Sequence, residues 1–521
     1  MVPHKPIIRG DRRYLLIAHK PDTTKVLNNF GYPVPPPILT RYDWAGQTPF
    51  DSQRATAAML TAYRRAYVLN EMGTGKTLAS LFAFDFLKKM GAANKMLVVA
   101  PLSTLNVVWM HEIFARLPHL EAVVLHGTRQ KRHLLLEQDA DIYIINHDGL
   151  KTFCKEQRHG RTTSLVLGDA LKARPDIDVV LIDELGIYRN KSTDRWKSAA
   201  AALEGRKWGW GMTGGPIPKA PTDAWAQMRL LTPENTTWSF RQFREEVMYQ
   251  VNQFKWLPKN NALETVHKQM HPSVRYTRAE CMDLPPTTYS DRVAKLSKDQ
   301  HTAYTEMLKE YCFNSAAGEV TALNAGVRAT KLLQICCGFV YGNTDLDTGH
   351  RPTIRLDHRA RIDVVEEVVD QSEGKVIVFV PYKEAISLVA NGLKGKVTTA
   401  TISGDTPKRE RDTTFALFQH SPNPKVLIAH PKVMSHGLTL TAASTILWYA
   451  VLPDLEIYDQ ACARVTRPGQ VRHTHIIHIV STKTEQGIAN VLQKRGNVQQ
   501  ALLDMFARDR GATMLKALAG L

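Results

Sequence analysis

The feature that most constrains the fold is a series of short apolar runs separated by helical stretches. Five runs in the first part of the chain are rich in β-branched residues and do not alternate with polar residues: 66–69, 95–100, 121–126, 141–145 and 178–183. Strands buried on both faces of a parallel sheet have this composition, because helices cover both faces. The stretches between the runs, such as 76–90, have the length of the crossover helices that parallel strands require.

A second series of the same kind follows later in the chain. Its runs are 375–380, 396–402, 425–430, 444–450 and 473–480. The region between the two series, roughly 235–350, has more helical periodicity. We therefore predict an α/β protein with two doubly wound parallel-sheet lobes joined by a helical segment. The predicted divisions are an irregular, proline-marked extension at 1–45, a first lobe at 46–290, a second lobe at 291–490 and a helical tail at 491–521.

The composition of the chain limits which classes of binding partner and which cellular compartments we expect for it. The formal net charge is +17 and the pI is about 9.5, which favours nucleic acid over an anionic membrane. No apolar run has the length of about 18–20 residues that a membrane span needs, and the N-terminus lacks the apolar core of a signal peptide. The six cysteines form no C-x-x-C pair, which indicates reduced thiols in a cytoplasmic protein without zinc.

A glycine-rich stretch, NEMGTGKT at 70–77, follows the first buried run. Such a loop at the start of a helix surrounds phosphate oxygens with backbone N–H groups, with Gly73, Thr74 and Gly75 forming the loop. Lys76 would contact the β- and γ-phosphates of ATP, and Thr77 would bind Mg²⁺. Asn70 stands where the usual pattern has glycine. Because asparagine tolerates left-handed backbone, we expect the turn to be preserved.

The buried run 178–183 ends in a carboxylate, Asp183, and a second carboxylate, Glu184, follows it. Asp183 would bind the Mg²⁺ shell, and Glu184 would orient and deprotonate the attacking water. Taken alone, the pair could be an acidic strand end on the surface. In order after the phosphate loop, it indicates ATP hydrolysis.

Three polar residues of the second lobe, Gln460, Arg464 and Arg467, follow one another at spacings of four and three. On a single helix they would share one face. Two arginines directed at one point suit a γ-phosphate whose charge develops in the transition state. The alternative is a solvated basic helix face.

These motifs together resemble the Swi/Snf-type branch of the superfamily-two helicases, over about 48–490. The matching segments are TPFDSQ (48–53), NEMGTGKT (70–77), VVAPLSTLNVVWMHEI (98–113), IINHD (144–148), DELGIYRNKST (183–193), MTGGPI (212–217), KVIVFV (375–380) and the long stretch 435–470. The short insertions are similar to those of compact phage and bacterial members. The resemblance implies two RecA-like lobes, the cofactors ATP and Mg²⁺, and Gln53 as the adenine-recognising glutamine.

The resemblance also implies residue roles beyond hydrolysis. Four positions would couple the ATP state to movement: Thr213, Gly214, Gly437 and Gln460. Six would contact the backbone of one nucleic-acid strand: Ser103, Thr104, Asn146, His147, Ser435 and Thr439. Polar groups of this kind suit sequence-independent phosphate contact, although each could equally be a helix cap. The basic stretch 151–161 is either a further docking surface or a solvated loop.

Some positions depart from the family pattern. They are Leu185 and Gly186 in place of Ala-His, Gly215 in place of Thr, Thr439 in place of Asn, Tyr449 in place of an acidic residue, and Thr466 in place of His. None of them removes a group that hydrolysis needs.

The predicted function is an ATP-driven translocase that follows duplex DNA without sequence preference. It would remodel branched or protein-bound DNA in replication, recombination or repair, in the cytoplasm of a bacterial or phage-infected cell. Three alternatives remain open: an RNA-directed helicase, the motor of a restriction-type complex, and a non-catalytic nucleic-acid scaffold.

Overall fold

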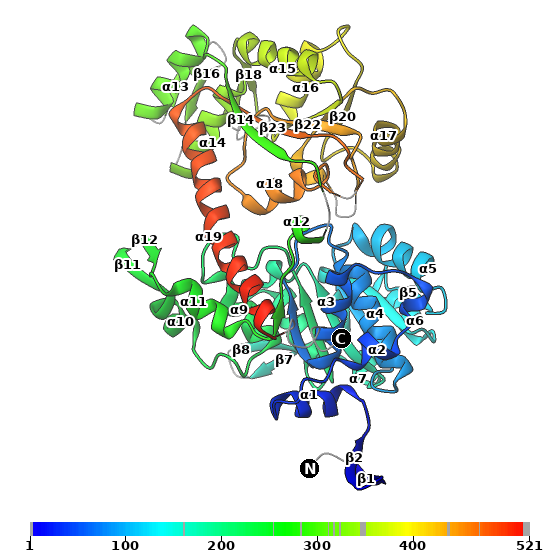
Figure 1. The fold of residues 1–521 in the computed structure, drawn as a ribbon. Helices are drawn as coiled ribbons and strands as arrows, with labels where there is room; N and C mark the ends of the chain where they lie inside the picture. Colours follow the sequence, from blue (N-terminus) through cyan, green and yellow to red (C-terminus); the bar gives the residue numbers. More distant parts are fainter. Residues whose placement is uncertain are drawn as a thin grey trace. The chain divides into compact units, whose positions relative to one another are not determined.

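The computed structural model describes residues 4–513 except 160–161, 254, 282–283, 311, 316–317, 322–324, 344–350, 435–437 and 468 (Figure 1). The chain divides into two compact units. Unit 1 comprises Met1–Met282 and Asn497–Leu521, and unit 2 comprises Asp283–Gly496. Each unit is built on one large parallel sheet. Among the described residues, no helix combines the length and the apolar character needed to cross a bilayer.

Seven parallel strands form the sheet of unit 1, in the order β13-β3-β10-β9-β4-β6-β5. Their bounds are β3 Arg65–Val68, β4 Lys95–Ala100, β5 Ala122–Val124, β6 Ile142–Asn146, β9 Ile177–Asp183, β10 Trp208–Met212 and β13 Ser273–Val274. Successive residues of a strand enter different cores. Tyr67 and Val99 belong to one core, and their neighbours Val68 and Val98 belong to the other. This confirms the five predicted strands and the doubly wound arrangement.

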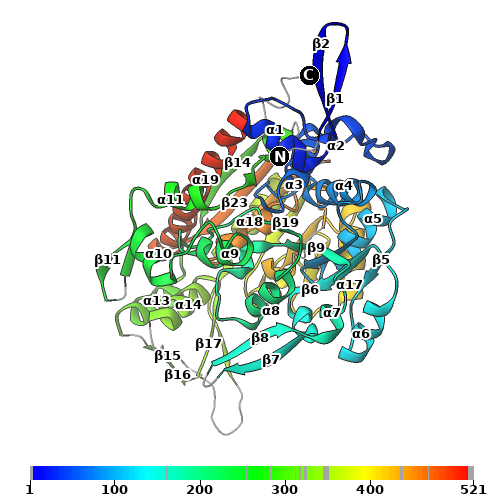
Figure 2. The same ribbon diagram turned by 90° about the horizontal axis from the view of Figure 1, so that it is seen from below.

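Helices cover both faces of this sheet (Figure 2). One face packs against α2 Pro37–Arg41, α3 Asp51–Ala62, α4 Lys76–Lys89 and α5 His111–Arg116. The other packs against α6 Arg129–Glu137, α7 Asp169–Lys172, α8 Asp194–Leu203, α9 Asp223–Leu231, α10 Phe240–Val247 and α11 Ala262–Gln269. Leu502 and Leu503, from the end of α19 Lys483–Thr513, are buried in this second core. Unit 1 also contains five short helical turns: η1 Trp44–Gly46, η2 Leu105–Met110, η3 His147–Phe153, η4 Leu185–Tyr188 and α12 Arg278–Cys281.

The N-terminal segment is not irregular, so this part of the prediction is wrong. It contains an antiparallel hairpin, β1 His4–Arg9 with β2 Arg12–Ile17, and the helix α1 Pro21–Asn29. Gly10 in the turn has φ 58°, which favours glycine and permits the tight hairpin.

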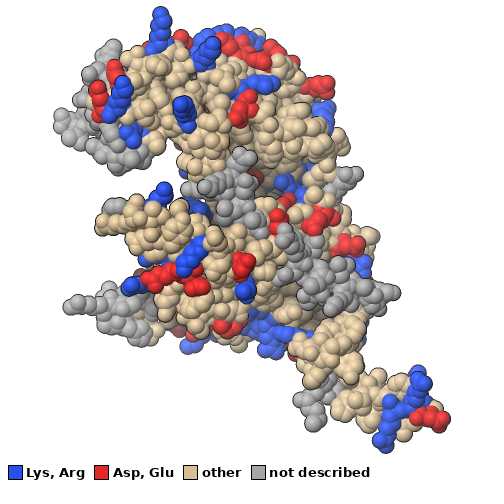
Figure 3. Space-filling model, turned by 60° about the vertical axis from the view of Figure 1, so that its left-hand side comes forward, with Lys and Arg blue, Asp and Glu red and all other residues tan. Residues whose placement is uncertain are grey.

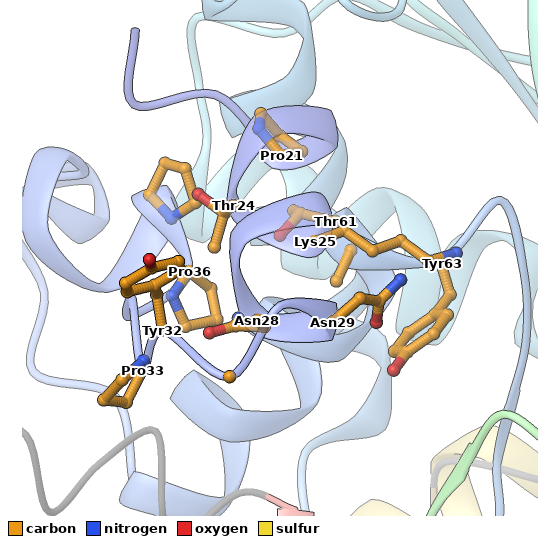
Figure 4. Close-up of a pocket in the computed structure, with 13 residues that line it drawn as sticks. Pro21, Thr24, Lys25, Asn28, Asn29, Tyr32, Pro33, Pro36, Thr61 and Tyr63 are labelled. Carbon is orange, nitrogen blue, oxygen red and sulfur yellow. The ribbon is translucent and has the colours of Figure 1, made fainter. Parts of the chain in front are cut away.

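A cavity of about 450 Å³ lies beside α1 and is lined in part by Lys25, Tyr32 and Tyr63 (Figure 4).

Two further hairpins belong to unit 1. They are β7 Cys154–His159 with β8 Thr162–Leu167, and β11 Met248–Asn252 with β12 Lys255–Pro258. The first hairpin corrects the interpretation of 151–161 as a loop, because most of that basic stretch forms η3 and β7.

Six parallel strands form the sheet of unit 2, in the order β14-β23-β22-β19-β21-β20. Their bounds are β14 Thr287–Val293, β19 Lys375–Phe379, β20 Thr399–Ile402, β21 Val426–Ala429, β22 Ala443–Trp448 and β23 Thr474–Val480. The five predicted strands are present, and two cores again lie on opposite faces. The strand β14 was not predicted, because this edge strand is mostly exposed and polar and lacks an apolar run.

Two helices of unit 2, at 298–310 and 325–336, confirm the helical character predicted for the middle region. Unit 2 contains α13 Lys298–Glu310, α14 Ala325–Cys336, α15 Arg359–Gln371, α16 Lys383–Gly392, α17 Lys408–His420, the turn η5 Pro431–Val433 and α18 Leu455–Cys462. Two hairpins, β15 Cys312–Ser315 with β16 Gly318–Thr321 and β17 Phe339–Tyr341 with β18 Thr353–Arg355, interrupt the helices.

Candidate active site

The phosphate loop of unit 1 connects β3 to α4, as predicted. Gly73 and Gly75 have φ angles of 86° and 77°, which residues with a side chain rarely adopt. Gly75 has a second requirement. A Cβ at this position would lie 2.2 Å from Nε2 of Gln53. The two glycines therefore provide the turn that leads into the N-terminus of α4, where backbone N–H groups suit an anion.

The turn is preserved at Asn70, as expected, but the expected reason, tolerance of left-handed backbone, is wrong. The φ of Asn70 is not positive, since Trp44, Ala45 and Glu184 are the non-glycine residues with positive φ in the described part of the chain. The buried amide donates from Nδ2 to Oγ1 of Thr56 at 2.9 Å and accepts through Oδ1 from the N–H of Tyr276, also at 2.9 Å. Asparagine therefore connects the loop to α3 and to the segment after β13, which glycine could not do.

Lys76 lies at the first position of α4 and is partly buried. Its ammonium donates to the carbonyls of Asn70 and Glu71 at 2.9 and 3.0 Å. Burial lowers the pKa of Lys76 from its ordinary value, while the charges of Glu184 and Asp183 act to raise it. The cation is thus held at the loop, within the electrostatic reach of the acidic pair.

Glu71, which the sequence did not single out, clamps the loop. Its carboxylate forms ion pairs with Arg275 at 2.9 Å and with Arg278 at 3.2 Å, and it accepts from the N–H of Arg278 at 3.0 Å. Arg275 is only 1% exposed and also donates to the carbonyl of Leu69 at 2.7 Å. Burial alone would raise the pKa of Glu71, but the two arginines outweigh it and the pKa lies below its ordinary value.

Asp183 ends β9, and Glu184 follows it. The indole N–H of the fully buried Trp109 donates to Oδ2 of Asp183 at 3.2 Å, and the N–H of Glu184 donates to Oδ1 at 3.1 Å. Glu184 has φ 54° and ψ 54°, a left-handed conformation that is uncommon for a residue with a side chain. Such conformations cost about 1–3 kcal/mol and are concentrated at functional sites. The anchored Asp183 and the strained Glu184 fit the predicted catalytic pair.

The loop after β10 lies against both catalytic segments. Met212 is the register partner of Asp183, and the N–H of Thr213 donates to the carbonyl of Val68 at 3.0 Å. A Cβ on Gly214 would be 3.8 Å from the carbonyl oxygen of Asn70, which is ordinary contact distance. Thr213 and Gly214 therefore contact the strand and loop that carry the phosphate-binding residues.

Gln53 is almost fully buried in the first turn of α3. Its Oε1 accepts from the N–H of Phe50 at 2.9 Å, and its Nε2 lies 3.5 Å from the carbonyl oxygen of Gly75. The side chain therefore stands beside the phosphate loop. Its role toward adenine stays a prediction.

The predicted nucleic-acid residues of unit 1 follow two neighbouring strands at the same sheet edge. Ser103 and Thr104 follow β4, whereas Asn146 and His147 lie at the end of β6, the parallel neighbour of β4. Thr104 is buried and donates to the carbonyl of Pro101 at 2.9 Å. His147 is buried, and its Nδ1 lies 2.8 Å from the hydroxyl of Tyr188. For Thr104 and His147 these contacts favour a structural role of the side chain. Ser103 and Asn146 are partly exposed.

The arginine motif of unit 2 is not one continuous helix, so that prediction is wrong. The helix α18 contains Gln460 but ends at Cys462, before Arg464 and Arg467. The helix ends six residues before Pro468, so the proline, which restricts mainly the residue before it, does not account for this end. Arg464 is 4% exposed, and a guanidinium N–H of Arg467 donates to the carbonyl of Leu438. Thr439 is exposed, whereas Ser435 and Gly437 lie outside the described residues.

Two family models match this chain. A family model described as SNF2-related domain matches residues 57–337, and one described as Helicase conserved C-terminal domain matches 360–469. Protein p41 of Acyrthosiphon pisum secondary endosymbiont phage 1 is 25% identical over 485 residues, covering 88% of this chain and 98% of p41.

Other relatives are longer than this chain. The ATP-dependent helicase MG018 of Mycoplasma genitalium is 24% identical, and the DNA annealing helicase and endonuclease ZRANB3 of Mus musculus is 22% identical. The matches cover 84% and 81% of this chain, but only 40% and 37% of those relatives. Among solved structures, the SWI2/SNF2 ATPase core of Sulfolobus solfataricus with double-stranded DNA matches at a TM-score of 0.39 and 22% identity, covering 91% of this chain and 95% of that one.

The family model of the SNF2-related domain covers more than half of the chain and includes the phosphate loop, the acidic pair and the loop after β10. The chain therefore belongs to the SNF2-related family and carries ATP-hydrolysing helicase domains of the SNF2 type.

Proposed function

We propose that the chain is an ATP-driven translocase that moves along duplex DNA and remodels branched or protein-bound DNA. The observation that carries the proposal is the carboxyl edge of the unit 1 sheet. There Lys76, the Asp183–Glu184 pair and Thr213 follow strands β3, β9 and β10, which are adjacent and parallel. Family membership supports the ATPase part of the proposal.

In this proposal the phosphate loop binds the nucleotide and Lys76 contacts its terminal phosphates. Thr77 and Asp183 would hold Mg²⁺, and their hydroxyl and carboxylate oxygens are the hard ligands that this ion prefers. The two carboxylate oxygens of Asp183 accept the hydrogen bonds described above, which hold the carboxylate at the end of β9. When bound, the ion would neutralise phosphate charge.

Glu184 is proposed to orient and deprotonate the attacking water. Because its backbone is held in a left-handed conformation directly after an anchored Asp183, its carboxylate starts from a fixed main-chain position. Arg464 and Arg467 stay a prediction as the groups that stabilise charge on the γ-phosphate.

Duplex DNA is the proposed partner. The charge of +17 supplies affinity for phosphates in general, and one relative is named a DNA annealing helicase. A motor of this kind displaces what lies ahead of it. Migrating a branch point needs little net energy, because pairs broken on one arm re-form on another. We propose that this occurs in the cytoplasm of a bacterial or phage-infected cell, which the phage relative supports.

Two measurements test the proposal. The ATPase rate is determined without nucleic acid and with single-stranded DNA, duplex DNA, branched DNA and RNA. Duplex or branched DNA should stimulate most. Stimulation by RNA alone would favour an RNA-directed helicase.

The second measurement compares three substrates at one salt concentration: a triplex, a four-way junction and a tailed duplex. The protein should displace the third strand and migrate the junction using ATP. It should open the tailed duplex poorly, because each base pair opened there costs about 1.4 kcal/mol of stacking without return. Efficient opening of the tailed duplex without triplex displacement would refute translocation. Glu184→Gln provides the ATPase-deficient control.

A further inference from the structure

We propose that the hairpin β1–β2 is a second binding site for duplex DNA, separate from the ATPase motifs. The hairpin comprises His4–Arg9 and Arg12–Ile17 and belongs to unit 1. The identity of its ligand rests on the proposed function. The exposure, charge and strand register of the hairpin indicate the site itself.

Both faces of the hairpin are exposed. Every residue from 4 to 16 is exposed apart from the partly buried Ile7. The exposed set includes large apolar side chains, with Ile8 at 70%, Leu15 at 61%, Leu16 at 57% and Tyr14 at 45% exposure. A two-stranded ribbon without a covered face is marginally stable in water, and apolar patches on a soluble protein commonly mark interaction sites. The hairpin therefore has the properties of a surface that a partner covers.

The charge of the hairpin favours a polyanion as that partner. Lys5, Arg9, Arg12 and Arg13 carry four positive charges against the single carboxylate of Asp11. Lysine and arginine side chains gather on this projection of the molecular surface (Figure 3). A second copy of the chain would bring like charges together, whereas a phosphate backbone would be complementary.

The strand register places two cations opposite each other, and a bound phosphate would reduce the repulsion between them. Arg9 pairs directly with Arg12, so two positive side chains lie opposite each other on one face. Like charges in this position destabilise a hairpin. Arg13 pairs with Ile8 on the other face, next to the turn. The end of the ribbon is therefore positively charged on both sides, which suits a position between two phosphate backbones.

The middle of the ribbon supplies apolar contacts. Ile7 pairs with Tyr14 on the face of Arg9, and Pro6 pairs with Leu15 on the opposite face. The major groove of B-form DNA is about 12 Å wide and admits a two-stranded ribbon, where apolar side chains contact thymine methyl groups. The major groove of duplex RNA is too narrow for side chains to read. The geometry thus favours duplex DNA over duplex RNA.

The test removes the three arginines from the full-length chain, as R9A/R12A/R13A. The matched control, K172A/K207A/R241A, removes three exposed cations elsewhere in unit 1. A charge-preserving variant, R9K/R12K/R13K, separates loss of charge from disruption of the hairpin. Fluorescence anisotropy measures binding to one duplex DNA and to duplex RNA of the same sequence, over a series of salt concentrations. The ATPase rate without nucleic acid serves as the check that the motor is intact.

The alanine variant should bind duplex DNA more weakly, by about 5-fold at 0.15 M salt for each arginine that pairs with a phosphate in the wild type. The slope of log K against log salt should fall by about 0.9 for each such arginine. The lysine variant should keep the slope, and the ATPase rate without nucleic acid should be unchanged in all variants. Equal effects of R9A/R12A/R13A and of the control would overturn the proposal.

Two other results have a definite meaning. If Leu15→Asp converts a dimer into a monomer in sedimentation while DNA affinity is unchanged, the hairpin binds a second copy and the proposal is wrong. If DNA stimulates the ATPase of neither the wild type nor any variant, the proposed motor function is refuted. The anisotropy measurement still decides whether the hairpin binds duplex DNA.

Discussion

Replacing Glu71 by glutamine should destabilise unit 1 by about 3 kcal/mol, although the side chain keeps its size. Arg275 is 1% exposed and would lose the carboxylate that lies 2.9 Å away. Removing one partner of a buried ion pair costs about 3–5 kcal/mol, because the other charge stays buried without compensation. The lower value applies here, since Glu71 itself is 25% exposed. Burial lowers the pKa of Arg275 more than Glu71 raises it, as expected for the more deeply buried partner.

The pH dependence follows from the direction of the Glu71 shift. Its pKa is below the ordinary value of 4.5, so the folded state favours the ionised form. The contribution to stability is fully present above the unfolded pKa and is lost as the pH falls through the folded pKa. The difference between the wild type and Glu71→Gln should therefore be complete at pH 7 and should shrink only below about pH 4.5.

Tryptophan fluorescence during urea unfolding is the appropriate assay. Of the nine tryptophans, only Trp448 lies in unit 2, so the signal reports mainly on unit 1. The matched control is Glu245→Gln. Its ion pair with Arg241 has the same chemistry and a distance of 2.8 Å, but the two side chains are 50% and 82% exposed. Exposed pairs contribute about 0–1 kcal/mol. Equal, small effects of both substitutions would refute the assignment of Glu71 as a buried clamp.

The remaining predictions concern hydrolysis. Lys76→Ala should retain the fold but lose ATP turnover, because phosphate charge at the loop is then uncompensated; turnover near the wild-type rate would contradict this. Glu184→Gln should bind ATP and hydrolyse it at least ~100-fold more slowly, as measured by nucleotide binding and steady-state rates. Arg464→Ala and Arg467→Ala should each lower kcat far more than they raise KM, since arginines acting on transition-state charge contribute ~10³–10⁵ in rate in other P-loop enzymes. If only KM changed, the two arginines would contact ATP in the ground state and not the charge of the transition state.

The sequence was most informative where local and tertiary requirements agree. Strands such as 95–100 and 375–379 are buried on both faces, so an apolar β-branched run is sufficient to identify them. The strand β10, with the sequence WGWGM, has no such signal. Its glycines are needed because a Cβ at Gly209 would lie 2.8 Å from Leu203, and one at Gly211 would lie 2.7 Å from Leu185. Glycine is depleted in strands in general, so packing overrides propensity here.

The candidate site could likewise be predicted only where a local sequence pattern is sufficient. The phosphate loop and the acidic pair follow from local patterns of a few residues. The clamp of Glu71 on Arg275 joins residues 204 positions apart, and the bond from Trp109 to Asp183 joins residues 74 positions apart. No local pattern encodes such distant pairs. The helix predicted through Arg467 failed because residue spacing does not show where a helix ends, and α18 ends at Cys462, before either arginine.

The departures from the family pattern in unit 1 are connected through packing. A Cβ at Gly186 would lie 3.0 Å from the carbonyl oxygen of Gly215 and 3.1 Å from Oγ1 of Thr213, so the usual histidine would require these neighbours to shift by a few tenths of an ångström. Gly215 in turn lies against Gln499 of α19, where a Cβ would approach the side-chain amide to 2.8 Å. A larger residue at Gly215 would therefore displace the end of the Gln499 side chain. We infer that the absence of a side chain at residue 186 permits the close contact between the acidic segment and the main chain of residue 215 in the loop after β10.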